Sequence, residues 1–205
     1  PFSIILWQAA RAQMSMSERL TVPPPALPVD PLGRMLSQFG ASLNELSRQQ
    51  PLLLVFLRHS GCTFCRETLG DLAKQRDRIE AQGTQIALVH MGQREPEALL
   101  ARYGLTDLHC FRDPMCQLYD LFGLKLGSFR QLFGFTVWRR GPKALLSHGV
   151  GRTGGNTFRM PGAFLLYRGA PVRAFRHLSV AERPDYVALA RLPVGCEVDR
   201  SAVSR

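Results

Sequence analysis

The stretch Leu52-Leu-Leu-Val-Phe-Leu-Arg-His-Ser-Gly-Cys-Thr-Phe-Cys-Arg-Glu-Thr-Leu69 decides the fold that this sequence predicts. Its first six residues are uniformly apolar, which is typical of a strand in the middle of a sheet that is covered on both faces. A short polar turn follows, and Cys62 and Cys65 then stand where a helical pattern begins. The sequence therefore predicts a buried strand that leads into a helix carrying a Cys-x-x-Cys pair.

Strand-like and helix-like stretches alternate along the rest of the chain. Helices are expected over 33–50, 65–82 and 96–103, after Asp113-Pro114, and over 185–191. Strands are expected over 84–90 and 109–112, and a β-hairpin is expected from 163–167 and 172–175, which flank 168–171. This order predicts a compact α/β domain with a central mixed β-sheet, and parallel neighbours in it require a right-handed crossover.

The chain of 205 residues suits one domain with extensions at its ends. Residues 20–32 hold five prolines, so an extended linker is expected there, with neither a helix nor a central strand. We therefore divide the chain into an N-terminal extension with its proline-rich linker (1–32), an α/β domain (33–192) and a C-terminal tail (193–205).

The Cys-x-x-Cys pair points to redox chemistry. Thiolate is the reactive form of cysteine, and a helix N-terminus favours it because unpaired N–H groups and the helix dipole attract an anion. Arg58 and Arg66 could add positive charge. Two intervening residues let the second sulfur reach the first, so a mixed disulfide or an oxidised sulfur can be resolved within the motif. We therefore expect both sulfurs to be accessible at the positive end of the helix.

Two structural interpretations of these cysteines compete with the redox one. A zinc site would need more ligands, and Cys110 and Cys116 are spaced too widely for a second zinc pair, although His59 and His109 could contribute. Alternatively, the cysteines are inert and pack as small hydrophobic residues, which is the favoured interpretation for Cys110 and Cys116.

The net charge of +10 is unevenly distributed along the chain. Residues 121–181 contain ten basic side chains and no Asp or Glu: Lys125, Arg130, Arg139, Arg140, Lys143, Arg152, Arg159, Arg168, Arg173 and Arg176. This segment could belong to a binding module for nucleic acid or an acidic partner, with structural cysteines. A solvated basic surface without a nucleic-acid partner is the favoured interpretation, because basic charge alone indicates a partner weakly.

The remaining composition suggests a compartment. Five cysteines with one close pair fit a reducing compartment, so a cytoplasmic location is expected. The chain begins at Pro1, and its short apolar stretch 4–7 lacks the basic start and the length of a signal peptide. No apolar run approaches the ~20 residues of a membrane span, and the glycine-rich stretch 149–155 lacks a phosphate-binding frame, so neither a membrane partner nor a cofactor is expected.

A second motif lies late in the chain, where Arg159-Met-Pro-Gly162 precedes a strand-like run. A proline at the mouth of a strand cannot donate to the ladder. A cis bond before Pro161 would turn the chain sharply and bring the Met160 backbone near another loop. Met160 and Pro161 are therefore candidate site residues.

Together these motifs resemble the thioredoxin superfamily, and more narrowly its peroxiredoxin-like branch in the AhpC/TSA group, which includes selenoprotein-L-like proteins. The similarity spans about residues 35–190 and is carried by three segments: 56–67 with the Cys-x-x-Cys pair, Phe111-Arg-Asp-Pro-Met-Cys-Gln-Leu-Tyr119, and Met160-Pro-Gly-Ala-Phe-Leu-Leu-Tyr-Arg-Gly169. The resemblance implies a thioredoxin-like fold and a cis proline.

The resemblance also implies a function: an antioxidant thiol oxidoreductase that reduces peroxides or protein disulfides and is re-reduced by a thioredoxin- or glutathione-type thiol. Cys62 and Cys65 would carry the reaction, and Pro161 would shape the substrate groove. Arg58, Thr63, Arg66 and Met160 are supporting candidates. Thioredoxins attack with the cysteine at the position of Cys62. Typical peroxiredoxins have threonine at the position of Cys62 and attack with a cysteine at the position of Cys65. The sequence therefore leaves open which of the two cysteines is the nucleophile.

Overall fold

The computed structural model describes residues 29–58, 62–92, 96–127, 159–179, 181–194 and 196. Its centre is a five-stranded sheet with the order β3-β2-β1-β4-β5. The strands are β1 (Leu52–Phe56), β2 (Gln85–His90), β3 (His109–Arg112), β4 (Gly162–Tyr167) and β5 (Ala170–Arg176). Parallel pairing joins β1 to β2 and β2 to β3, whereas β4 is antiparallel to β1 and β5 to β4. The predicted mixed sheet is confirmed.

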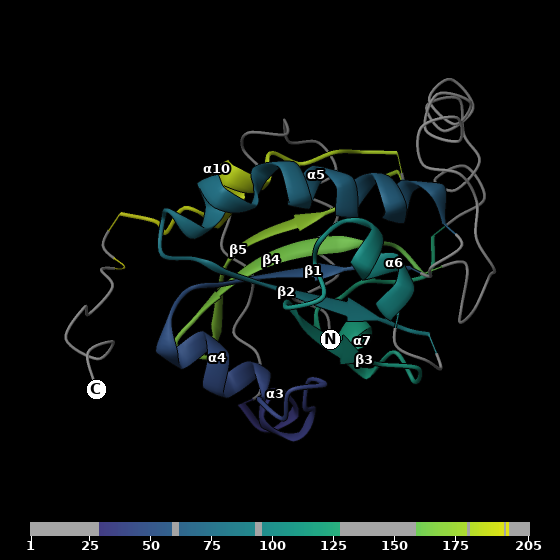
Figure 1. Ribbon diagram of the computed structural model, residues 1–205. Helices are drawn as coiled ribbons and strands as arrows, with labels where there is room; N and C mark the ends of the chain where they lie inside the picture. The colour runs from purple at the N-terminus through teal and green to yellow at the C-terminus, as the bar shows by residue number, and fades with distance from the viewer. Residues whose placement is uncertain are drawn as a thin grey trace.

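Helices cover both faces of this sheet (Figure 1). Their bounds are α3 (Val29–Arg34), α4 (Leu43–Gln49), α5 (Thr63–Glu80), α6 (Glu97–Arg102), α7 (Gln117–Leu121) and α10 (Tyr186–Ala190). All five residues of β1 are buried, as a central strand with two covered faces requires. The predicted hairpin closes more tightly than expected, because Arg168 and Gly169, both at positive φ, form a two-residue turn.

Two apolar cores result, one on each face. The first core lies between the sheet and helices α5, α6 and α10, and it contains Cys62 and Cys65. The second core lies on the opposite face with α3, α4 and α7, and its centre is aromatic: Phe56, Tyr119, Phe122 and Phe164. Side chains of β1 alternate between the two, with Val55 in the first core and Phe56 in the second.

The expected single helix over 33–50 is wrong, because the chain forms α3 and α4 with a turn between them. Gly40 adopts a φ of 81°, which no helix tolerates. Ser42 then begins α4 with a capping box: its hydroxyl accepts from the Glu45 N–H, and the Glu45 carboxylate accepts from the Ser42 N–H. The expectation of no helix before residue 33 is also wrong, since α3 accommodates Pro31 in its first turn.

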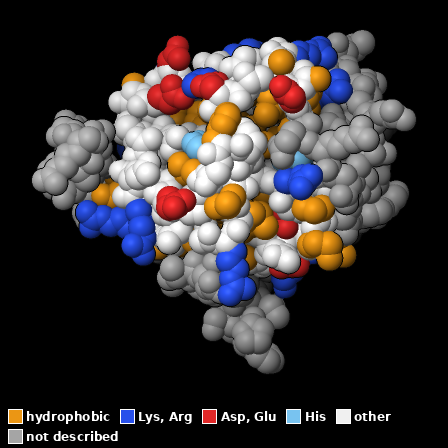
Figure 2. Space-filling view, turned by 60° about the horizontal axis from the view of Figure 1, so that its bottom comes forward, with side chains coloured by type: hydrophobic (Ala, Val, Ile, Leu, Met, Phe, Trp, Pro, Cys, Tyr) orange, Lys and Arg blue, Asp and Glu red, His pale blue; other side chains and the backbone are white. Residues whose placement is uncertain are grey.

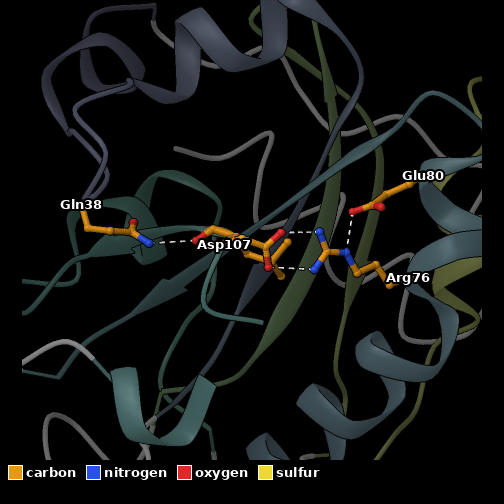
Figure 3. Close-up of polar contacts among 5 residues, drawn as sticks. Gln38, Arg76, Glu80 and Asp107 are labelled. Carbon is orange, nitrogen blue, oxygen red and sulfur yellow. Dashed lines mark hydrogen bonds and ion pairs between the residues drawn. The ribbon is translucent and has the colours of Figure 1, made fainter. Parts of the chain in front are cut away.

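A polar network ties the α3–α4 turn to the edge of the sheet and to α5 (Figure 3). The Gln38 side chain donates to the Leu108 carbonyl at 2.8 Å and accepts from the Cys110 N–H at 2.7 Å. Asp107, the residue before Leu108, pairs through both carboxylate oxygens with Arg76 of α5. The outer strand β3 is thereby fixed from two sides.

In the described part of the chain, we find no helix with the length and apolar character of a bilayer-crossing segment.

Candidate functional site

The Cys-x-x-Cys pair lies where β1 gives way to α5. Cys62 is the residue that caps the N-terminus of α5, with extended backbone (φ −74°, ψ 118°). Cys65 lies in the first turn of the helix, and the Arg66 N–H in that turn donates to the Cys62 carbonyl at 3.1 Å. The predicted position of the pair at a helix N-terminus is therefore correct. An 18-residue helix presents its positive end to these two sulfurs.

Arg58 contacts both sulfurs. Its backbone N–H donates to Cys65 Sγ at 3.2 Å, and its guanidinium Nη1 lies 3.7 Å from Cys62 Sγ. Arg58 is itself buried, so its charge acts on Cys62 with little screening by solvent. Of the three arginine and threonine candidates, Arg58 is the one whose contact with the sulfurs is established. Thr63 and Arg66 belong to the same first turn of α5.

The pKa of Cys62 is lowered to about 6. The largest cause is the hydrogen bond from the Cys65 side chain, and the Arg58 charge and the backbone N–H groups of Cys65 and Phe64 act in the same direction. Burial opposes them by disfavouring the charged sulfur. Cys62 is consequently mostly thiolate near neutral pH, and Cys65 is placed to donate to it.

Both cysteines are buried, with exposed fractions of 7% for Cys62 and 4% for Cys65. Both carry thiols, and no disulfide joins them. The sequence predicted an accessible pair, and this expectation is wrong, because both side chains belong to the buried first core. The helix end favours the thiolate electrostatically, while the core restricts access to it.

Met160 and Pro161 lie at the same end of the sheet as the cysteines. The pairing of Phe56 with Gly162 brings the start of β4 beside the end of β1. Met160 is buried and its N–H donates to the Lys125 carbonyl at 3.0 Å. The expected cis bond is wrong, because all peptide bonds of the described residues are trans, that of Met160 and Pro161 included. The turn into β4 is instead secured by backbone hydrogen bonds on both sides of Pro161, since its carbonyl accepts from the His177 N–H at 3.4 Å.

The other described cysteines have separate surroundings. Cys110, in β3, is buried in the first core. Cys116 precedes α7 with a φ of 57°, and burial raises the pKa of its thiol. Cys196 is partly exposed. The packing role expected for Cys110 and Cys116 agrees with their burial.

Tyr119, which was not among the site residues expected from the sequence, reaches the site from the second core. This fully buried side chain donates its hydroxyl hydrogen bond to the Leu57 carbonyl, with Val89 O a second acceptor at 3.3 Å. Leu57 directly precedes Arg58, so Tyr119 holds the peptide next to the cysteine pair. The only signal in the sequence was its place in the segment shared with the peroxiredoxin-like branch.

The zinc hypothesis finds no ligand set among the described residues, where no three His, Cys, Asp or Glu side chains are grouped to hold a metal. His109 instead hydrogen-bonds Ser37 at 2.9 Å and stacks edge-on against Phe39. His59 lies outside the described residues.

Half of the ten basic residues in segment 121–181 lie outside the described residues: Arg130, Arg139, Arg140, Lys143 and Arg152. Two of the others serve the fold. Arg159 pairs with Asp120 at 2.6 Å, and Arg176 donates to the Phe122 carbonyl and lies over the Phe164 ring. On the face drawn in Figure 2, Lys and Arg side chains form separate groups with acidic side chains among them.

Comparison with solved structures identifies the fold. Peroxiredoxin Q of Xanthomonas campestris superposes with a TM-score of 0.58 and 18% identity, covering 82% of this chain and 95% of that one. A second structure from this organism, described as bacterioferritin comigratory protein, gives 0.58 at 17% identity over 82% and 96% of the two chains.

Peroxidoxin BcpB of Mycobacterium tuberculosis gives a TM-score of 0.53 at 12% identity, covering 84% of this chain and 95% of that one. No protein-family model and no curated protein matches the chain by sequence. The thioredoxin-like fold implied by the sequence resemblance is confirmed, and the chain has the architecture of these peroxiredoxin structures.

Proposed function

We propose that this protein is a thiol-dependent oxidoreductase that cycles between a Cys62–Cys65 dithiol and a disulfide, as an antioxidant acting on peroxides or disulfides. The observation that carries the proposal is the contact between the two sulfur side chains, which lowers the pKa of Cys62 to about 6 beside Arg58. A buried thiolate with a second thiol in hydrogen-bonding reach is suited to attack and resolution within one motif. The peroxiredoxin fold supports the same chemistry by analogy.

The attacking sulfur in this proposal is Cys62. Its thiolate attacks the terminal oxygen of a hydroperoxide, the O–O bond breaks, and Cys62 becomes a sulfenic acid, while the leaving alkoxide or hydroxide takes a proton from solvent and departs as an alcohol or water. The Cys65 sulfur then attacks Cys62, water leaves, and the internal disulfide forms. With a disulfide substrate, Cys62 first forms a mixed disulfide and releases a thiolate, and Cys65 then displaces the second sulfur. A thioredoxin- or glutathione-type thiol returns the pair to its dithiol form.

The burial of the pair favours a small oxidant. Cys62 exposes 7% of its surface, which leaves more room for the two oxygens of a peroxide than for a disulfide carried by another protein. Arg58 also suits a peroxide, because its guanidinium lies beside the attacking sulfur, where negative charge develops on the leaving oxygen. We further propose that the cycle runs in a reducing compartment such as the cytoplasm, in line with the cysteine content.

The decisive experiment maps the cysteines after one equivalent of hydrogen peroxide. In the wild type we expect a Cys62–Cys65 disulfide as the dominant product, formed before Cys110, Cys116 or Cys196 reacts. In Cys65→Ser the reaction stops at a sulfenic acid on Cys62, which a dimedone probe traps; in Cys62→Ser no fast product forms.

Cys110→Ser is the matched control, because it removes another buried thiol of the same core and leaves the pair intact. Slow oxidation spread over all five cysteines of the wild type would refute the proposal. Fast labelling of Cys65 in Cys62→Ser would show instead that Cys65 is the nucleophile.

A further inference from the structure

One peptide unit connects the two cores at the cysteine pair. The carbonyl of the Leu57–Arg58 peptide accepts the Tyr119 hydroxyl from the second core, and the N–H of the same peptide donates to Cys65 Sγ in the first core. The Cys65 side chain in turn hydrogen-bonds Cys62. A continuous chain of hydrogen bonds therefore runs from a tyrosine on one face of the sheet to the thiolate on the other.

The Tyr119 hydroxyl is a costly group to place there unless it has a partner. The side chain is fully buried among aromatic rings, with Phe56 at 5.0 Å between ring centroids, so phenylalanine would suit the packing. Burial also raises the pKa of Tyr119 far above its usual range, so the hydroxyl keeps its proton and acts as a donor. The acceptors, Leu57 O and Val89 O, are carbonyls at the ends of β1 and β2.

We propose that Tyr119 is a positioning residue that tunes the acidity and the reduction potential of the Cys62–Cys65 pair through the Leu57–Arg58 peptide. The inference rests on the proposed redox function and adds to it a determinant that lies outside the Cys-x-x-Cys motif.

The direction of the effect follows from hydrogen-bond cooperativity. A donor on the Leu57 carbonyl polarises the peptide and strengthens the Arg58 N–H as a donor, by about 10–30% per bond in a chain of this kind. A stronger bond to Cys65 Sγ makes the Cys65 thiol a better donor to the Cys62 thiolate. Tyr119 therefore stabilises the dithiol form with its charged sulfur.

The same bond acts when the disulfide is reduced. The thiolate of an external dithiol attacks Cys62, the Cys62–Cys65 bond breaks, and Cys65 leaves with the electron pair as a thiolate. The Arg58 N–H already points at the sulfur that receives this charge. Weakening that N–H as a donor disfavours the reduced pair.

The test is a pair of substitutions at Tyr119 that act in opposite directions. Tyr119→Phe removes the donor, so we expect the Cys62 pKa to rise by about half a unit and the disulfide to become about threefold more favoured in glutathione buffers. A 3-fluorotyrosine at position 119 keeps the shape and makes the hydroxyl a stronger donor, so both quantities should move the other way. The readouts are the pH dependence of Cys62 alkylation and the fraction of Cys62–Cys65 disulfide at a set glutathione ratio.

Tyr167→Phe is the matched control. It removes the hydroxyl of another buried tyrosine, which lies at the end of β4 away from the cysteine pair, since the neighbouring Leu166 pairs with the first residue of β1. Equal shifts in Tyr119→Phe and Tyr167→Phe would reduce the effect to loose packing and overturn the proposal. So would unchanged pKa and disulfide fraction in both Tyr119 variants. If Tyr119→Phe fails to fold, the fluorinated protein alone decides.

The two failures are distinguishable. A wild-type protein in which glutathione buffers never join Cys62 to Cys65 contradicts the proposed function. A wild-type pair that cycles normally, with potentials unaffected by Tyr119, contradicts only this inference.

Discussion

The starts of α5 and α7 place the same side chain in similar settings. Cys62 and Cys116 each directly precede a helix, and their exposed fractions are nearly equal, at 7% and 6%. Each also has an arginine nearby, Arg58 for Cys62 and Arg159 for Cys116. Even so, the pKa of Cys62 is lowered to about 6, while the pKa of Cys116 is raised above its usual value.

The difference comes from what lies opposite each sulfur. Burial raises the pKa of both thiols, and at Cys116 it is the largest cause. Asp113 and Asp120 add negative charge there, and Asp120 pairs with Arg159 at 2.6 Å. At Cys62 the side chain three residues on is Cys65, which hydrogen-bonds the sulfur, whereas the residue three after Cys116 is Tyr119, which points to Leu57. A helix start and an arginine are therefore insufficient, and the second thiol decides.

The largest expected effect separates the two cysteines by activity. Cys62→Ser should lower peroxide or disulfide turnover at least about thousandfold, because a serine hydroxyl does not ionise near neutral pH. Cys116→Ser should stay within about twofold of the wild type, since its thiol is held protonated. Steady-state turnover with dithiothreitol as reductant measures both. A Cys116→Ser variant as inactive as Cys62→Ser would contradict the conclusion that only Cys62 is reactive.

The next largest effect is a difference between Cys62 and Cys116 in how their alkylation rates depend on pH. Alkylation of Cys62 by iodoacetamide should rise about tenfold between pH 5 and pH 7, as the thiolate grows from about a tenth to about nine tenths of the population. Over the same interval Cys116 should react far more slowly, and its rate should keep rising about tenfold per pH unit above pH 7, where that of Cys62 levels off. Peptide mapping after timed alkylation reports both sites in one sample, and parallel profiles would contradict the assignment.

The lowered pKa also predicts how stability changes with pH. A thiol whose pKa is depressed by folding stabilises the native state fully above its unfolded pKa, and this contribution is lost as the pH falls through the folded value. The free energy of unfolding of the reduced protein should therefore rise between about pH 6 and pH 9. Urea titrations should show this rise in the wild type and not in Cys62→Ser. An equal rise in both proteins would assign it to other groups.

A smaller effect is expected from the arginines. Arg58→Gln should raise the pKa of Cys62 by about one unit, because an opposite charge close to the sulfur is lost. Arg159→Gln is the control at the other helix and should leave the Cys62 alkylation midpoint where it was. A Cys62 midpoint that Arg58→Gln does not move would assign the low pKa to Cys65 and the backbone alone.

The smallest expected effect concerns the charged side chains around Cys116, at the start of α7. Asp120→Asn removes a negative charge near Cys116 and releases Arg159 from its ion pair. Alkylation of Cys116 at pH 8 should rise about threefold, a modest change because the Asp120 carboxylate is solvent-exposed and screened. Mass spectrometry of the Cys116 peptide measures it, and a decrease would contradict the charge argument.

Local pattern predicted most of the fold. The apolar run of β1, the helix start at the Cys-x-x-Cys pair and the hairpin around Gly169 depend on neighbouring residues, and all three are confirmed. The division of 33–50 into two helices was also readable in principle, from Gly40 and the Ser42–Glu45 capping box.

Long-range contacts explain what the sequence could not predict about the site. Tyr119 hydrogen-bonds Leu57, 62 residues away in the chain, and no local sequence pattern predicts that contact. Cys62 and Cys65 are buried as members of the first core, to which α10 contributes from the far end of the chain. The lowered pKa of Cys62 depends on the geometry of Arg58 and Cys65 around it.

The Gln38 carboxamide has a consequence beyond the tie it makes to β3. An amide side chain that accepts from the Cys110 N–H and donates to the Leu108 carbonyl occupies the two positions that the backbone of an added strand would use. Exposed strand edges are where separate molecules join into larger sheets. The Gln38 side chain therefore blocks two hydrogen-bonding positions on β3 at which a second molecule could otherwise extend the sheet.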